Sequence, residues 1–178
     1  MAAEYAFFTR WRFRATAKEV SDILGDALSL PRWWPSVYLD VKELAPGDPT
    51  NQIGRVIDLY TKGWLPYTLR WRFRVTESNP PHGFKLVAEG DFVGTGVWTL
   101  KQAGEFVDVT YDWRIAATKP LLRIGTPILR PIFGANHRWA MARGEASLEL
   151  ELRRRRAHSE TERAAVPAPP GPTFTRRR

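Results

Sequence analysis

Apolar and polar residues alternate along residues 4–15, the first patterned segment of the chain. Tyr5, Phe7, Trp11 and Phe13 fall on one side, and arginines occupy the other side from position 10 on. A period of two is typical of a half-buried β-strand. The segment is therefore predicted to be a strand with one aromatic face and one basic face.

The pattern then changes to helical spacing. Thr16 and Glu19 have the spacing of a capping box, and the apolar residues that follow share one helical face. Gly25 allows this helix to end. The stretch SLPRWW, residues 29–34, has a capping serine and an early proline, which predicts a second short helix.

The chain returns to strand-type spacing from about residue 37 to residue 117. Turn-rich separators such as APGDPTN, SNPPHG and AGE interrupt it at regular intervals, which favours consecutive antiparallel hairpins. The predicted strands lie at residues 37–45, 52–61, 65–78, 83–90, 93–102 and 106–117.

The last patterned segment predicts an uninterrupted helix from about residue 131 to residue 154. Pro127 and Pro131 are expected to make its beginning irregular. If Ile132 and Trp139 face inward, Asn136 lies on the same stripe of this helix, and His137 lies on the adjoining one.

This order of elements predicts an α+β fold. An antiparallel sheet with one apolar face must cover that face, and the long amphipathic helix is the available cover. We expect a curved antiparallel sheet of about seven strands that grips the C-terminal helix, with two short helices after the first strand. Residues 1–154 would form this single domain, with an aromatic-lined cavity between sheet and helix.

The net charge of +8 is concentrated in the C-terminal segment. Eight arginines and two glutamates lie from residue 153 on, so the preceding 152 residues carry only +2. The segment is rich in proline and poor in large apolar residues. We therefore expect residues 155–178 to form a disordered basic tail, with at most weak attraction to anionic surfaces.

Composition excludes several kinds of site. The absence of cysteine rules out disulfides, Cys-ligated zinc and a cysteine nucleophile. Three scattered histidines do not form a metal site, and Gly94 and Gly96 are not followed by a helix, as a dinucleotide site would require. We expect no metal and no cofactor. No secretory signal or membrane-spanning run is evident, which suggests a cytoplasmic protein.

The heptapeptides RWRFRAT and RWRFRVT begin at Arg10 and Arg70. Arginines beside aromatic residues raise the possibility of nucleic-acid binding, but on a strand the two kinds of side chain point to opposite faces. No specific nucleic-acid partner is therefore expected. The arginines at 10, 12 and 14 should instead meet carboxylates such as Asp108 and Asp112, if the first and last strands pair.

The order of elements over residues 4–152, together with the stretches PRWWPSVY and FGANHRWAMARGEASLELEL, resembles the START-type, or helix-grip, superfamily. That superfamily includes polyketide cyclases, dehydrases and lipid-transfer proteins. The resemblance implies an internal cavity for an apolar ligand. It does not decide between an enzyme, a carrier and a sensor.

Ten residues are candidates for ligand contact, because pockets of this kind are lined mainly by aromatic and apolar side chains with a few polar groups. They are Trp33, Trp34, Tyr38, Trp71, Phe73, Tyr111, Trp113, Ile132, Asn136 and Trp139. Asn136, His137 and Tyr111 are weak candidates for proton chemistry. No catalytic residue is assigned, since a catalytic histidine needs a partner within reach and the sequence marks none.

Three functions are compatible with these patterns. The first is binding or transport of a hydrophobic or aromatic small molecule, such as a lipid or a polyketide-like compound. The second is a cyclase or dehydrase that uses the same cavity. The third is binding of an anionic partner through the arginine-rich tail. The sequence leaves open whether any reaction is catalysed, and which oligomeric state the protein adopts.

Overall fold

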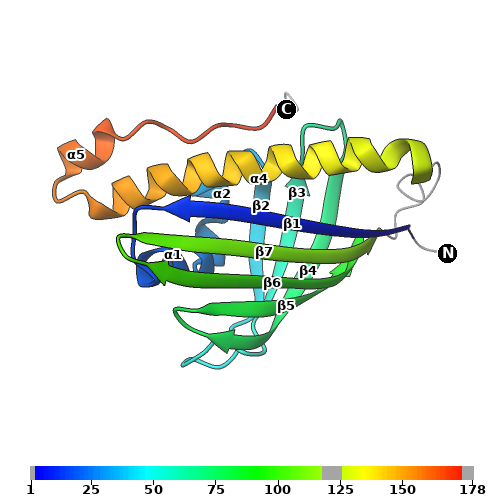
Figure 1. The fold of residues 1–178 in the computed structure, drawn as a ribbon, viewed down its shortest axis with the longest axis horizontal. Coiled ribbons are helices and arrows are strands. Elements are labelled where there is room, and N and C mark those ends of the chain that lie inside the picture. The colour runs from blue at the N-terminus through cyan, green and yellow to red at the C-terminus, as the bar shows by residue number, and fades with distance from the viewer. Residues whose placement is uncertain (1–2, 118–125, 174–178) are drawn as a thin grey trace.

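A curved antiparallel sheet covered by one long helix forms the body of the protein (Figure 1). The computed structural model describes residues 3–117 and 126–173. Its strands are β1 (Ala3–Phe13), β2 (Tyr38–Ala45), β3 (Val56–Lys62), β4 (Thr68–Asn79), β5 (Gly83–Gly90), β6 (Phe92–Ala103) and β7 (Phe106–Ala117). Its helices are α1 (Ala17–Gly25), the 3-10 turn η1 (Ala27–Ser29), α2 (Leu30–Trp33), α4 (Thr126–Arg156) and α5 (Glu160–Ala165).

The described strands form one sheet in the order β1-β7-β6-β5-β4-β3-β2. Strands β2 to β7 follow one another as antiparallel neighbours, and β1 pairs with β7. The predicted α+β helix-grip architecture is confirmed.

The strand β3 begins later than expected. Asp48 Oδ1 accepts hydrogen bonds from the backbone N–H groups of Thr50 (2.8 Å) and Asn51 (3.1 Å), which holds this segment in a turn.

The capping box at the start of α1 is present as predicted. Thr16 Oγ1 accepts from the Glu19 backbone N–H at 3.2 Å, and the Glu19 carboxylate accepts from the Thr16 backbone N–H at 2.8 Å. These bonds satisfy donors that a helix start otherwise leaves without partners. They fix the point at which the chain leaves β1 and turns beneath α4.

The two arginine-rich heptapeptides lie on β1 and β4 with their aromatic side chains buried and their arginines exposed. Arg12 meets Asp108 at 3.3 Å across the β1–β7 pair, as predicted. Arg14 pairs with Glu105, whereas Asp112 pairs with Arg114 on its own strand. Such exposed pairs contribute only about 0–1 kcal/mol each, so the aromatic face supplies most of the stability.

The long helix α4 is longer than predicted, with Pro131 inside it. Its final arginines bind carboxylates of the α1–η1 region: Arg156 Nε lies 2.7 Å from Glu19, and Arg155 Nη2 lies 2.9 Å from Asp26. These contacts tie the C-terminal end of α4 to the start of the domain.

No described helix combines the length and apolarity needed to cross a membrane.

The segment after α4 differs from the expected disordered tail over residues 155–173. Ser159 caps the short helix α5, and its Oγ accepts from the Glu162 backbone N–H at 3.1 Å. The chain then turns back along α4 (Figure 1), and Arg154 donates to the Pro167 carbonyl at 3.1 Å. Composition alone could not predict this arrangement, because it depends on contacts made by arginines that belong to α4. Residues 174–178 of the expected tail lie outside the described residues.

Candidate ligand-binding cavity

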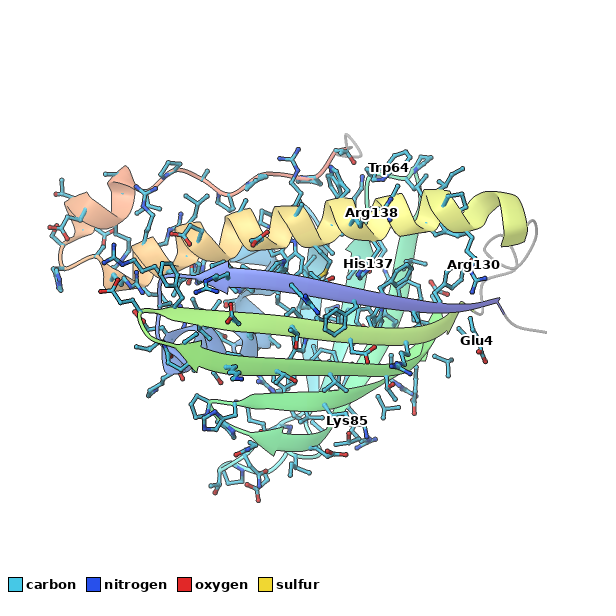
Figure 2. The ribbon with its side chains drawn as sticks, in the orientation of Figure 1. Glu4, Trp64, Lys85, Arg130, His137 and Arg138 are labelled. Carbon is cyan, nitrogen blue, oxygen red and sulfur yellow. The ribbon has the colours of Figure 1, made fainter. Side chains whose placement is uncertain are left out.

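A cavity of about 130 Å³ lies between the concave face of the sheet and the N-terminal half of α4. The helix lines it with Phe133, Asn136, His137, Ala140 and Met141, which follow one another at helical spacing. Figure 2 shows His137 on the side of α4 that faces the sheet. The cavity is thus built mainly on the sheet and one helix, and Gly63 and Tyr67 between β3 and β4 also line it.

The sheet contributes an aromatic wall to this cavity. Tyr111 and Trp113 of β7 stack with 5.6 Å between their ring centroids. The ring centroids of Trp113 and Trp71 of β4 lie 5.5 Å apart. Trp98 of β6 also stacks on Tyr111, with 4.1 Å between the ring centroids. Aromatic contacts of this kind contribute about 0.5–1.5 kcal/mol each beyond burial, so the wall has little freedom to collapse into the cavity.

The stretch PRWWPSVY forms the corner between α2 and β2. Trp34 and Tyr38 line the cavity, with their rings 5.2 Å apart. Trp34 also supports α4, because a Cβ atom at Gly144 would overlap its indole ring. Burial raises the pKa of the Tyr38 and Tyr111 hydroxyls, so both stay protonated at neutral pH.

Three residues that line the cavity have a buried polar atom without a hydrogen-bond partner among the described residues. The atoms are Tyr5 Oη on β1, Trp34 Nε1 after α2 and His137 Nε2 on α4. Burial, and to a smaller extent the charge of Arg138, lowers the pKa of His137 to about 4. The imidazole is therefore neutral at physiological pH and can either donate or accept one hydrogen bond at Nε2.

Asn136 fastens the β3–β4 loop to α4. Its Oδ1 accepts from the backbone N–H groups of Trp64 (2.9 Å) and Leu65 (3.3 Å), and a Cβ atom at Gly63 would overlap its amide. The sequence suggested that Asn136 orients a ligand carbonyl or handles protons. In the structure its oxygen holds the loop beside the cavity, and a role of Asn136 toward a ligand stays a prediction.

Replacing Asn136 by alanine is expected to release this loop. The loss of two hydrogen bonds should reduce the free energy of unfolding by about 1–2 kcal/mol. Deuterium exchange at the Trp64 and Leu65 amides should become at least tenfold faster. Asn136→Asp keeps an acceptor oxygen and should retain the protection, whereas unchanged exchange in Asn136→Ala would show that the loop is held by other contacts.

Comparison with known proteins identifies the fold. Neither a protein-family model nor a curated protein sequence matches the chain. Among solved structures, ZhuI, an aromatase/cyclase from a Streptomyces species, is similar with a TM-score of 0.66 and 16% identity, over 88% of this chain and 98% of its own. The chain has the START-type helix-grip fold.

Two further solved structures are similar to this helix-grip domain. TTHA0849 from Thermus thermophilus has a TM-score of 0.68 and 15% identity, over 86% of this chain and 100% of its own. A START superfamily protein from Mycobacterium smegmatis has a TM-score of 0.64 and 16% identity, over 83% of this chain and 96% of its own. At these identities the likeness shows the fold alone.

The helix-grip domain brings six of the ten predicted contact residues to the cavity wall: Trp34, Tyr38, Trp71, Tyr111, Trp113 and Asn136. Their contact with a ligand stays a prediction. Trp33 is fully buried in the core, and Phe73 lies two residues beyond Trp71, at a separate hollow next to α1. Neither residue lies on the wall of this cavity.

Ile132 and Trp139 also lie away from the cavity, which corrects the predicted inward stripe of the helix. Ile132 is 37% exposed. The guanidinium carbon of Arg143 lies 5.5 Å from the centroid of the Trp139 ring. The inward stripe is displaced by one residue and includes Phe133 and Ala140. The ring of Phe133 packs edge-on against Tyr5 of β1, with 5.8 Å between ring centroids, which turns this stripe toward the sheet.

The sequence missed Tyr5, Phe7 and Phe133 as cavity residues. Tyr5 and Phe7 were recognised only as part of the buried face of β1. The register of β1 against β7, which places Tyr5 opposite Ile115, brings them to the same end of the sheet as the cavity. No group of three or more metal-binding side chains occurs within residues 3–117 and 126–173.

Proposed function

We propose that this protein binds a hydrophobic or aromatic small molecule in the cavity between the sheet and α4. The observation that carries the proposal is a hollow walled by Trp71, Tyr111 and Trp113 that the protein's own side chains leave unfilled. Protein interiors are normally close-packed, and an apolar hollow gains dispersion and hydrophobic energy when a ligand fills it. A lipid chain or a polyketide-like ring would supply such a surface.

An enzyme that uses the same cavity is the second candidate. ZhuI, one of the similar structures, is an aromatase/cyclase, and His137 and Tyr111 both reach the cavity of this chain. The lowered pKa of His137 counts against proton transfer, because a general base works best when its pKa is near the ambient pH. Binding without turnover is therefore the better-supported function.

Binding of an anionic partner through the C-terminal arginines receives less support. Arg154, Arg155 and Arg156 each pair with a carboxylate of the folded domain. Three of the eight arginines that suggested such a partner are therefore engaged within the protein.

The experiment is a titration followed by tryptophan fluorescence, because three of the eight tryptophans line the cavity. Naphthalene and oleic acid serve as a ring-type and a chain-type probe, and native mass spectrometry shows any ligand retained during purification. At least one probe should give saturable quenching. Ala140→Phe, which fills the cavity, should weaken that binding at least tenfold.

Ala142→Phe is the matched control, since Ala142 lies on the exposed side of the same helix. It should bind like the wild type. Thermal unfolding establishes that both variants are folded. The proposal fails if neither probe saturates the wild type, or if Ala140→Phe binds as well as Ala142→Phe.

A further inference from the structure

Tyr5 Oη, Trp34 Nε1 and His137 Nε2 are the buried polar atoms of cavity-lining residues that lack partners among the described residues. Of these three residues, Tyr5 and His137 both contact Phe7. A buried donor or acceptor without a partner costs free energy that folding alone does not recover. Phenylalanine in place of Tyr5 or His137 would fill the same space without this cost. Tyr5 Oη and His137 Nε2 therefore indicate a polar group of a ligand that completes their hydrogen bonds.

Aromatic neighbours hold both side chains in place. The imidazole of His137 stacks on the ring of Phe7, with 4.2 Å between the ring centroids and an interplanar angle of 14°. The centroid of the Tyr5 ring lies 5.9 Å from that of Phe7 and 5.8 Å from that of Phe133, which it meets edge-on. Because Phe7 contacts both rings, the two polar groups belong to one patch of the cavity wall, and a ligand group meets them already positioned.

A neutral hydroxyl matches this pair better than a carboxylate does. Both groups are uncharged at neutral pH, since burial raises the pKa of Tyr5 and lowers that of His137. Arg130 and Arg138 lie nearby but are exposed, where water screens their charge. Lys62 also borders the cavity, and burial lowers its pKa, which disfavours its charged form. A hydroxyl can donate to one of the two groups and accept from the other.

The volume limits what can be buried beside this pair. A cavity of about 130 Å³ is close to the roughly 150 Å³ engineered cavity that accepts benzene in another protein, and below the roughly 300–1,000 Å³ of typical ligand pockets. One aromatic ring fits it. Any longer part of a ligand would have to extend outside the cavity.

We infer that Tyr5 and His137 together bind the hydroxyl of a phenol-type ring, which is the part of the ligand buried in this cavity. This inference rests on the proposed function and makes it more specific. A phenolic ring is apolar on its faces and polar at one point, as is the cavity itself. The Asn136 oxygen already accepts two hydrogen bonds from the β3–β4 loop.

The test compares phenol with toluene, which replaces the hydroxyl by a methyl group of similar size. Ligand-observed NMR titrations give the dissociation constants for wild type, Tyr5→Phe and His137→Phe. Each variant should bind phenol about tenfold more weakly, as expected for one lost hydrogen bond, and toluene within about twofold of wild type. Tyr60→Phe removes a hydroxyl from a half-buried tyrosine that does not line the cavity and whose ring contacts Arg70, and it should change neither constant.

Two measurements can overturn the inference while ligand binding stands. A parallel loss of phenol and toluene affinity in the variants would show that the two groups only shape the cavity. Benzoate that binds the wild type more tightly than phenol would show that the pair recognises an anion. If the wild type binds neither phenol nor toluene, and neither naphthalene nor oleic acid, the proposed function fails as well.

A ligand-free measurement checks the premise of unpartnered atoms. Without ligand, Tyr5→Phe should have a melting temperature equal to or above that of the wild type, because it removes a buried hydroxyl that lacks a partner. A clearly lower melting temperature would mean that the hydroxyl is already satisfied inside the protein, which would also overturn the inference.

Discussion

Glu151→Ala should reduce the free energy of unfolding by about 3 kcal/mol. Glu151 is 1% exposed, and its carboxylate accepts from Arg32 (2.6 and 2.8 Å), Arg155 (2.8 Å) and Arg154 (3.2 Å). Removal of one partner from a buried ionic cluster typically costs about 3–5 kcal/mol, and the partial exposure of the arginines places this cluster at the lower end. Urea unfolding at neutral pH measures the change.

Glu149→Ala is the matched control, because Glu149 is an exposed carboxylate on the same helix. It should change stability by less than about 0.5 kcal/mol. If the two variants unfold at the same urea concentration, the cluster at Glu151 is not what secures α4 to α2.

The same carboxyl predicts how stability depends on pH. Burial alone would raise the pKa of Glu151, but the hydrogen bonds and charges of the arginines outweigh it and lower the pKa to about 2. Its folded pKa lies below the unfolded value of about 4.5, so its stabilising effect is complete above that value and is lost as the pH falls toward 2. Glu151→Gln should therefore flatten the decline in stability between pH 4.5 and 2.

Gly144→Ala should destabilise the protein although alanine favours helices. An added Cβ atom overlaps the indole of Trp34, which is 3% exposed and cannot move into solvent without losing its packing. Overpacking of this kind costs about 1–3 kcal/mol, which exceeds the gain of up to about 1 kcal/mol from helix propensity. Differential scanning calorimetry should show a lower melting temperature.

The helix supplies its own control for this prediction. A Cβ atom at Gly134 would lie 3.3 Å from Arg138 Nη1, the mobile end of a long side chain. Gly134→Ala should therefore stabilise the protein by up to about 1 kcal/mol. A loss of stability in both variants would point to a general need for glycine in α4, and a gain in both would show that Trp34 gives way.

Local patterns predicted the strands because the alternation of apolar and polar residues is visible within each strand alone. The alternation at Trp11 and Phe13 indicates the buried face of β1 without reference to any neighbour, and the same holds for Trp71 and Phe73 on β4. The capping box at Thr16 is likewise complete within four residues. Features that depend only on neighbouring residues in the sequence, such as these, were predicted correctly.

The site was predicted less completely because it depends on contacts between distant segments. Apolarity favoured Ile132 and Trp139 for the inward face of α4, but Gly144 packs against Trp34, which lies 110 positions earlier in the chain. The role of Asn136 depends on a loop more than 70 residues away, with sequence separations of 72 and 71 for its two bonds. No local pattern reports such contacts.

The ionic cluster and the cavity lie at opposite ends of α4. Glu151 and the final arginines secure the C-terminal end, whereas Phe133, His137 and Ala140 face the cavity. Substitutions at sites this far apart generally have additive effects on stability. Evolution can therefore revise ligand preference at one end of the helix while the other end preserves the fold, which makes this domain well suited to diversification.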